Sequence, residues 1–379
     1  MNSTYDCAII GGGLAGLTAS IQLASKGRSV VLIEKNHYPF HKVCGEYISM
    51  ESWEFLKGLG LPLDSMELPM INHFTLTHPQ NKKLDVRLPQ GGFGISRYTL
   101  DNALANLALE SGVIMLRGLS IDRLKFDKKT KLHVLHNEYG EIHAKTAIGA
   151  FGKRSRLDKE LKRPFIKKLK DKENNFVGIK YHIESDITPE NIELHLFEKG
   201  YAGISRIEEG KSCFCYLVSA AVLKRYRGDI EKMETEVLFQ NNFLRDRIEG
   251  KKKLFSEPLT ISQIEFGEKE QVFNHLLMSG DAAGMITPLT GNGMSMAMHG
   301  SKLAVEAIEG FLDGKSDQAG MEKQYIRQWN KQFRSRVRRG RRFQSWFFDE
   351  KFSLRLIGTL KYFPAIARMA IKSSHGKPF

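Results

Sequence analysis

The chain has 379 residues, of which 41% are hydrophobic and 26% charged, so it has the composition of a globular protein and is long enough for two interleaved lobes. No apolar run approaches the roughly 18 residues of a membrane span, and we expect no signal peptide before the first strand. The four cysteines show neither disulfide-framework nor zinc-ligand spacing. We therefore expect no metal site and a reducing, cytoplasmic environment.

The formal net charge is +14, and its densest part is the block 331–342. Either a solvated helix face or attraction to an anionic membrane, an acidic carrier protein or a phosphorylated substrate explains such a block. No nucleic-acid-binding module accompanies the charge, so we expect no nucleic-acid partner. For peripheral contact with an anionic membrane, the candidates are Arg334, Arg336, Arg338, Arg339, Arg341 and Arg342.

The N-terminal stretch carries the first motif. The apolar run 8–10 leads into Gly11-x-Gly13-x-x-Gly16, a helical pattern follows, and a second apolar run, 30–33, ends in Glu34. A strand, a glycine turn, a helix and a strand that closes on an acid form the dinucleotide-binding fingerprint. The helix N-terminus offers free N–H groups to phosphates, and Glu34 has the spacing to accept hydrogen bonds from an adenosine ribose.

The next part of the chain alternates between loops, strands and helices. Residues 35–49 predict a loop that leads into a helix, and 74–88 predict hairpin strands. Ser96-Arg97 opens a further helix, and 113–116 predict a third parallel strand. Residues 119–147 read as strand, lysine-rich turn and strand.

The stretch 176–264 changes character, because its apolar residues alternate at period two as in half-buried antiparallel strands. A charged helix over about 230–242 interrupts it. The chain then returns to a strand that ends in Gly280-Asp281, a glycine-rich loop through Gly291-Asn292-Gly293, and a helix. Residues 318–379 read as entirely helical.

Taken together, the glycine fingerprint, Ser96-Arg97 and the Gly280-Asp281 loop resemble the FAD-dependent oxidoreductases of the para-hydroxybenzoate hydroxylase fold. Lys42-x-Cys44-Gly45-Glu46 is most similar to the geranylgeranyl-reductase and monooxygenase-like branch. The resemblance implies an α/β fold: a Rossmann-like FAD-binding domain with a parallel sheet, an inserted antiparallel-sheet substrate domain and a helical C-terminus. The boundaries we expect are 1–70, 96–170 and 266–312 for FAD binding, 71–95 and 171–265 for the substrate domain, and 313–379 for the helical region.

The resemblance also implies where FAD lies. Asp281 faces the diphosphate-ribityl chain, Arg97 contacts the phosphates or the ribityl chain, and the helix after Gly293 directs its N–H groups at the flavin pyrimidine edge. An ordinary salt bridge for Arg97 and a helix cap for Asp281 stay open. The cofactor-binding residues we expect are Gly11, Gly13, Ala15, Gly16, Glu34, Lys35, Cys44, Gly45, Arg97, Asp281, Gly291, Asn292, Gly293 and Met294.

Two residues of the Lys42–Glu46 motif are catalytic candidates. Glu46 is an acid/base candidate because the resemblance places it near the isoalloxazine. Cys44 is a redox candidate, although no cysteine lies close to it in sequence, so a packing role beside Gly45 is the alternative. The family's middle Ala-Asp-Gly motif has Phe151 in place of the acid, so this chain lacks the carboxylate that, by the resemblance, helps organise FAD and NAD(P)H contacts in hydroxylases.

The sequence thus predicts an FAD-dependent oxidoreductase with NAD(P)H as co-substrate and a hydrophobic or carrier-bound substrate. A monooxygenase that uses reduced flavin and O2 is slightly favoured, because such enzymes are the larger population of the fold. Reduction of prenyl double bonds is the alternative. Another class, a membrane-docked electron-transfer flavoprotein, also stays open. The halogenase signature Trp-x-Trp-x-x-Pro is absent from the sequence.

Overall fold

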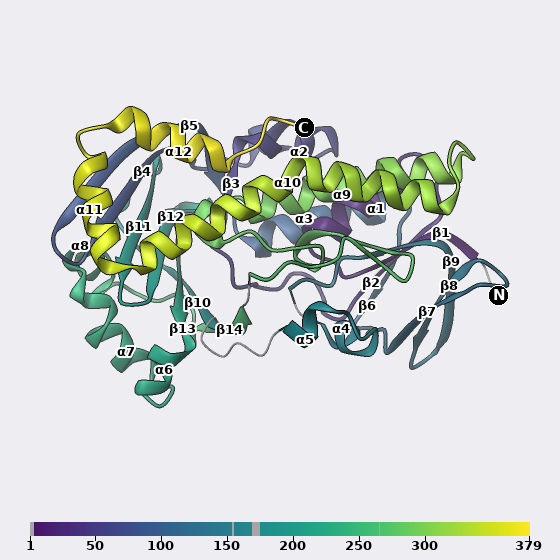
Figure 1. Ribbon diagram of the computed structural model, residues 1–379, viewed down its shortest axis with the longest axis horizontal. Helices are drawn as coiled ribbons and strands as arrows, with labels where there is room; N and C mark the ends of the chain where they lie inside the picture. Colours follow the sequence, from purple (N-terminus) through teal and green to yellow (C-terminus); the bar gives the residue numbers. More distant parts are fainter. Residues whose placement is uncertain (1–3, 154, 169–174, 265) are drawn as a thin grey trace.

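The computed structural model describes residues 4–153, 155–168, 175–264 and 266–379 (Figure 1). In this part of the chain, two sheets of eight strands each form two lobes, and one long helix runs along both. The expected domain boundaries at residues 170 and 265 fall outside the described residues. The α/β architecture with a parallel and an antiparallel sheet is as the sequence predicts.

The first sheet has the order β15-β16-β9-β1-β2-β6, and β7 and β8 extend it beside β9. The strands from β16 to β6 pair in parallel, as expected for buried apolar runs. The strands are β1 (Thr4–Ile10), β2 (Val30–Glu34), β6 (Ile114–Arg117), β7 (Arg123–Asp127), β8 (Leu132–Asn137), β9 (Gly140–Gly149), β15 (Val272–Phe273) and β16 (Leu276–Met278).

Four long helices accompany this sheet. Helix α1 (Leu14–Ala24) packs between α3 (Arg97–Glu110) and α9 (Gly293–Leu312), and α10 (Gln318–Phe348) packs along α9. Small buried residues allow α1 and α9 to approach closely, and the hydroxyls of Thr18 and Ser301 lie 2.7 Å apart between them. This packing brings the beginnings of α1 and α9, which are about 280 residues apart in sequence, to one end of the lobe.

The second sheet has the order β14-β10-β13-β12-β11-β4-β5-β3. Its neighbours pair antiparallel except β11 and β4, which are parallel. The strands are β3 (Tyr47–Ser49), β4 (Met70–His78), β5 (Lys82–Gly94), β10 (Phe176–Ile183), β11 (Asn191–Phe197), β12 (Gly200–Arg206), β13 (Ser212–Ser219) and β14 (Leu259–Ile264).

Strand β10 differs from the half-buried strand that its alternation predicts, because all eight residues are buried. Val177, Ile179 and Tyr181 pack in the apolar cluster beneath the helices that follow β13. The alternate positions Lys180 and His182 contact the loop before β3. The period-two pattern therefore separates an apolar face from a polar face that is turned toward the other lobe and not toward solvent.

Short helices cover the apolar face of this sheet. The helix predicted over 230–242 is broken into α7 (Ile230–Glu236), η5 (Leu238–Gln240) and α8 (Asn242–Ile248). The break follows from Asn241, a buried side chain that caps α8 and donates to Thr77 and to the Leu196 carbonyl. The other short elements are η1 (Met50–Ser52), α2 (Trp53–Gly58), η2 (Leu63–Ser65), α4 (Arg156–Glu160), α5 (Phe165–Lys168), η4 (Glu208–Gly210), α6 (Ala220–Arg225), η6 (Gly280–Ala282) and η7 (Pro288–Thr290).

The C-terminal region is helical, as predicted, up to Ser374. After α10, helices α11 (Glu350–Leu360) and α12 (Pro364–Ser374) pack on β4 and β5, at the end of the antiparallel lobe (Figure 1). Among the described residues, none of the helices combines the length and the apolarity that crossing a membrane requires.

Candidate functional site

The two glycine loops of the sequence meet at the carboxyl ends of β1 and β16. A Cβ at Gly280 would lie 3.2 Å from the Cβ of Ala15 and 3.6 Å from that of Ala297. Gly11 has a φ of +106°, and a Cβ on Gly16 would collide with the Gly11 carbonyl oxygen at 1.9 Å. The tight turn and close helix packing inferred for these glycines are therefore steric requirements.

Glu34 holds the first loop in place. Its buried carboxylate accepts hydrogen bonds from the Gly12 amide at 2.7 Å and from the Asn36 amide at 3.0 Å. The Tyr38 hydroxyl donates to the Gly12 carbonyl at 2.5 Å. Glu34 thus lies at the end of β2 where a ribose would be recognised, and its contact with ribose stays a prediction. Lys35, the next residue, has an exposed side chain.

Two cations face the N-terminus of α1. A Cβ at Gly13 would lie 3.8 Å from Arg97 Nη2 and from Lys42 Nζ. Both cations pair with Asp101: Arg97 in a bidentate manner at 2.7 Å, and Lys42 at 2.9 Å. Asp101 is buried. Because it carries one negative charge, it balances only one of the two cations. The excess positive charge and the free N–H groups of α1 suit a diphosphate.

Asp281 begins the second half of the site. Burial raises the pKa of its carboxyl, whereas the charges of Lys269, Lys153 and Arg97 act in the opposite direction. Burial also lowers the pKa of Lys153 and of Lys269 to about 8. Lys269 donates to the Asp281 carbonyl at 2.9 Å. A partly buried carboxylate among cations can accept hydrogen bonds from hydroxyl groups, as the ribityl assignment requires.

The loop before α9 completes the site. Gly291 has a φ of +66°, and Asn292 donates to the Ser374 carbonyl at 2.7 Å while its buried Oδ1 has no protein partner in the described structure. Gly293 begins α9, and Met294 Sδ lies 3.6 Å from Cys44 Sγ. Loops 44–45 and 291–294 are therefore neighbours, and a Cβ at Gly45 would point into open space.

Glu46 lies behind this loop in a buried ionic cluster. Its Oε1 pairs with Lys180 Nζ and accepts the Arg97 amide at 2.7 Å, and its Oε2 lies 2.7 Å from His182 Nε2. Burial alone raises the pKa of Glu46, but the His182 hydrogen bond and the Lys180 charge outweigh it, so this pKa is lowered. Glu46 also has a φ of +56°, which few non-glycine residues adopt.

These contacts favour a positioning role for Glu46 over the proton transfer expected from the sequence. Both carboxylate oxygens are occupied, and a carboxyl with a lowered pKa is a poor proton donor at neutral pH. The carboxylate ties the loop 42–46 to the polar face of β10 and to the first residue of α3. It holds Arg97 and Cys44 in register with the antiparallel sheet.

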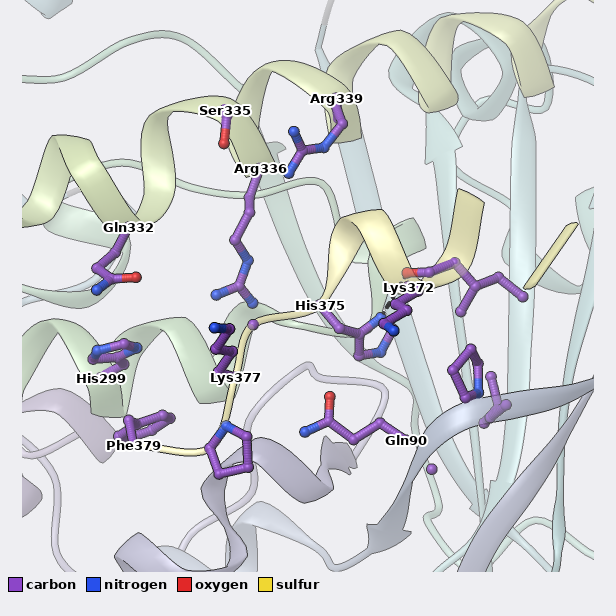
Figure 2. A pocket seen from close by; sticks show the side chains of 16 residues that line it. Gln90, His299, Gln332, Ser335, Arg336, Arg339, Lys372, His375, Lys377 and Phe379 are labelled. Carbon is purple, nitrogen blue, oxygen red and sulfur yellow. Dashed lines mark hydrogen bonds between the residues drawn. The ribbon is translucent and has the colours of Figure 1, made fainter. Parts of the chain in front are cut away.

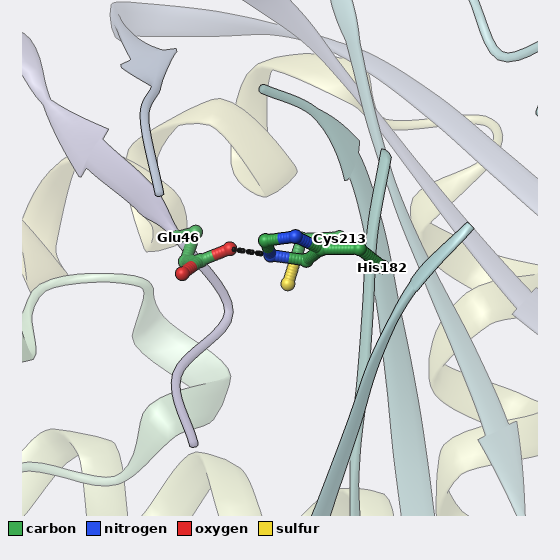
Figure 3. Close-up of side chains that lie close together, drawn as sticks. All are labelled: Glu46, His182 and Cys213. Atoms are coloured by element: carbon green, nitrogen blue, oxygen red, sulfur yellow. Dashed lines mark hydrogen bonds and ion pairs between the residues drawn. The ribbon is translucent and has the colours of Figure 1, made fainter. Parts of the chain in front are cut away.

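Figure 3 shows that Glu46, His182 and Cys213 converge, with possible ligand atoms within 4.8 Å of one another. Lys180 already neutralises Glu46 from within the same buried space. A divalent cation here would lie beside an ammonium group, which is electrostatically unfavourable. We therefore assign this cluster to hydrogen bonding and ion pairing.

No cysteine lies close to Cys44 in the sequence, but in the fold Cys213 of β13 lies beside it. Cys213 Sγ lies 3.3 Å from the Cys44 carbonyl oxygen, and Cys215 lies on the same face of β13. Burial raises the pKa of all three thiols, that of Cys215 to about 12. The described structure records them as free cysteines, and burial keeps them protonated.

The sequence did not reveal the charged side chains from other elements that pair with Arg97 and Glu46, or the cation that lies beside Arg97. Lys42, from the segment before β3, pairs with Asp101 of α3, and Lys180 and His182 come from β10. The i, i+4 spacing of Arg97 and Asp101 was available as a signal for that pair. The polar positions of β10 were also visible in the sequence, but the alternation assigned them to solvent.

The expected membrane-contact arginines divide into three exposed residues, one buried residue and the half-buried pair Arg339 and Arg341. Arg334, Arg338 and Arg342 form an exposed stripe along α10. Arg336 corrects the prediction, because it is buried, pairs with Glu51 at 2.9 Å and donates to the Ser374 carbonyl. A guanidinium with internal partners is unavailable to a lipid surface.

Comparison with known proteins identifies the family. The family model described as "FAD binding domain" matches residues 4–327. The chain belongs to this family. It is therefore an FAD-dependent oxidoreductase, and the grouping of two cations, an open Gly45 and an orphaned Asn292 oxygen fits FAD.

Relatives are distant but extend over most of the chain. The digeranylgeranylglycerophospholipid reductase of Methanosarcina acetivorans is 29% identical over 87% of this chain and 81% of its own length. Conditioned medium factor receptor 1 of Dictyostelium discoideum is 24% identical over 81% of this chain, which spans 63% of that protein. The 1H-pyrrole-2-carbonyl-[peptidyl-carrier protein] brominase of Pseudoalteromonas luteoviolacea is 24% identical over 82% of this chain and 79% of its own length. The structure of the flavin-dependent brominase Bmp2 superposes with a TM-score of 0.77 at 17% identity, covering 98% of this chain and 93% of that one.

Proposed function

We propose that the protein is an FAD-dependent reductase that saturates a carbon–carbon double bond in a long apolar, prenyl-type substrate, with NAD(P)H as the source of electrons. FAD, when bound, supplies hydride transfer. The double bond gains a hydride at one carbon and a proton at the other, and NAD(P)H is oxidised to NAD(P)+. The substrate class is that of the digeranylgeranylglycerophospholipid reductases among the relatives.

The observation that carries this choice is the convergence of three thiols on the loop beside Gly45. The Cys44 thiol contacts Met294, the Cys213 thiol contacts the Cys44 carbonyl oxygen, and Cys215 follows Cys213 on the same face of β13. An oxygen-activating flavin site produces an oxidant close to its own walls at every turnover, so even thiols that burial keeps protonated, and therefore slow to react, would meet it repeatedly. Hydride transfer without oxygen places no such burden on these cysteines.

Each half of the site has a defined part in this function. Lys42 and Arg97 bind the diphosphate with the N-terminus of α1, and Asp281 accepts from the ribityl chain. The first N–H groups of α9, a helix with no acidic residue in its first turn, stabilise negative charge at the flavin pyrimidine edge. Glu46, held by Lys180 and His182, fixes the loop between these two halves.

The second candidate is oxygen-dependent hydroxylation or epoxidation of a hydrophobic or carrier-bound substrate. The dipole of α9 favours it equally, because negative charge on the flavin also develops in that chemistry. The carrier-bound form of the substrate is suggested by the peptidyl-carrier-protein brominase among the relatives.

Anaerobic single-turnover kinetics separates the two. The FAD-loaded protein is reduced, mixed with a geranylgeranyl lipid without oxygen, and followed by flavin absorbance and product mass. The reductase predicts flavin reoxidation and a product heavier by two hydrogens. Reoxidation that requires O2, with a product that gains one oxygen atom, would contradict it and favour the monooxygenase. Geraniol-length alcohol and prenyl-free lipid serve as controls for chain length and for non-specific reoxidation.

A further inference from the structure

The corner between α11 and α12 exposes large apolar side chains. Tyr362 is 76% exposed, Met369 71%, Ile366 54% and Phe363 52%. The spacing of these four residues, which we call the α12 apolar stripe, is i, i+1, i+4 and i+7, so they share one side of the corner and of the first turns of α12. Ala367 and Ser374, which are seven residues apart and share one row of α12, are buried instead, and α12 contacts β5.

Basic residues border the stripe. Residues 350–379 contain six lysines and arginines but only one acidic residue, Glu350. Lys361 precedes the stripe, and Arg368 and Lys372 lie one turn apart along its edge, all three exposed. Among the residues that the structure describes, the recorded ion pairs include none of these three cations. An exposed apolar stripe with a basic edge is the pattern of a helix that lies in a membrane interface.

A cationic cavity adjoins the same helix. It has a volume of about 830 Å³ and lies between the end of α12, α10 and β5. Figure 2 shows Arg339, Lys372, His375 and Lys377 around it. His299 also lines it, is 8% exposed, and has a buried Nδ1 without a protein partner in the described structure. Lys372 therefore belongs both to the basic edge of α12 and to a cavity that suits an anionic headgroup.

We propose that the α12 apolar stripe docks the protein on an anionic lipid bilayer, with Lys361, Arg368 and Lys372 at the headgroups. Tyr362 is of a residue type enriched at membrane interfaces, and Phe363 is of a type found on the apolar face of interfacial helices. A second copy of the chain is a poor occupant, because it would set the same cations against each other. The docking is independent of the reaction proposed above, since none of these residues lies in the cofactor site.

The test is co-sedimentation of the full-length, FAD-loaded protein with vesicles of phosphatidylcholine alone and of phosphatidylcholine with phosphatidylglycerol. Wild-type protein is expected to partition strongly only to the anionic vesicles. Ile366→Gln with Met369→Gln lowers this partitioning by at least about tenfold, since each side chain loses apolar burial. Lys361→Gln with Arg368→Gln lowers it about 25-fold, since each basic residue near the surface contributes roughly a fivefold factor.

Matched controls lie at the other end of the molecule. Tyr139 is 84% exposed in the turn between β8 and β9, and Lys131 precedes β8. Tyr139→Gln and Lys131→Gln are expected to leave vesicle binding unchanged. All variants should retain the flavin spectrum and the melting temperature of the wild type. Equal recovery on neutral and anionic vesicles, or stripe variants that bind like wild type, would overturn the proposal. Stripe-dependent binding to an acidic carrier protein without vesicle binding would also overturn it and assign the surface to a protein.

Discussion

Two buried carboxylates, Asp101 and Glu46, each pair with basic side chains close to the loop 42–46, but their charge balance differs. Asp101 is shared by Lys42 and Arg97, so one positive charge remains at the N-terminus of α1. Glu46 pairs with the single ammonium of Lys180 and with the His182 imidazole. The first cluster is incomplete without an anion, and the second is complete by itself. Similar residue types therefore form an anion-binding site around Asp101 and a purely structural ion pair around Glu46.

The largest effect is expected when Glu46 loses its ion-pair partner. Lys180→Met leaves Glu46 buried without its ammonium partner, and we expect a loss of about 3–5 kcal/mol in the free energy of unfolding. Urea denaturation measures it. Lys145→Met, which removes a half-exposed cation paired with Asp6, is the control and should cost less than about 1 kcal/mol.

The double variant Lys180→Met/Glu46→Gln decides the cause. If the penalty comes from the uncompensated carboxylate, the neutral pair recovers most of the lost stability. If the double variant is as unstable as the single one, the role of Lys180 is packing and the comparison fails.

The sequence alone predicts one of these two clusters better than the other. The glycine turns, Glu34 and the Gly280-Asp281 loop are local signals, since each requirement is met within a few residues of chain, and they predicted the FAD-binding lobe. The partners of Glu46 come from β10, more than 130 residues away, and depend on which face of a strand is turned toward the other lobe. Period two defines two faces but does not say what covers each, so the polar face of β10 was assigned to solvent.

The next prediction concerns the open cluster. Arg97→Met removes one of two cations at the diphosphate position while Lys42 still neutralises Asp101, so the fold should persist. The dissociation constant of FAD is expected to rise roughly 10- to 150-fold, the worth of a charged hydrogen bond of about 1.5–3 kcal/mol. Quenching of flavin fluorescence measures it. Arg247→Met, which breaks a similar pair with Glu193 in the other lobe, is the matched control. An unchanged affinity of Arg97→Met for FAD would contradict a contact between Arg97 and the diphosphate and would show that Arg97 only pairs with Asp101.

The pH dependence of unfolding tests whether Glu46 is ionised in the folded protein. Its pKa is lowered in the folded state below the ordinary value of 4.5, so the native state binds fewer protons than the unfolded chain. The stabilisation from Glu46 is fully present above pH 4.5 and is lost as the pH falls through the folded pKa, at up to about 1.4 kcal/mol per pH unit. Unfolding free energies of wild type and Glu46→Gln should therefore converge in acid. A constant difference between the two would show that Glu46 has the same pKa in the folded and the unfolded chain and would contradict the lowered pKa.

The smallest expected effect is that of Cys44, which lies between the two clusters. Burial raises the pKa of this thiol, so it is protonated at neutral pH, and its nearest sulfur partner, Met294, is a weak acceptor. Cys44→Ser should therefore change FAD affinity and anaerobic flavin reoxidation by less than about threefold, the net worth of a weak hydrogen bond. Cys215→Ser, on the same sheet face, is the matched control. Loss of turnover in Cys44→Ser alone, with FAD affinity intact, would instead make the thiol a reacting group, because neither packing nor charge balance at the two clusters depends on it.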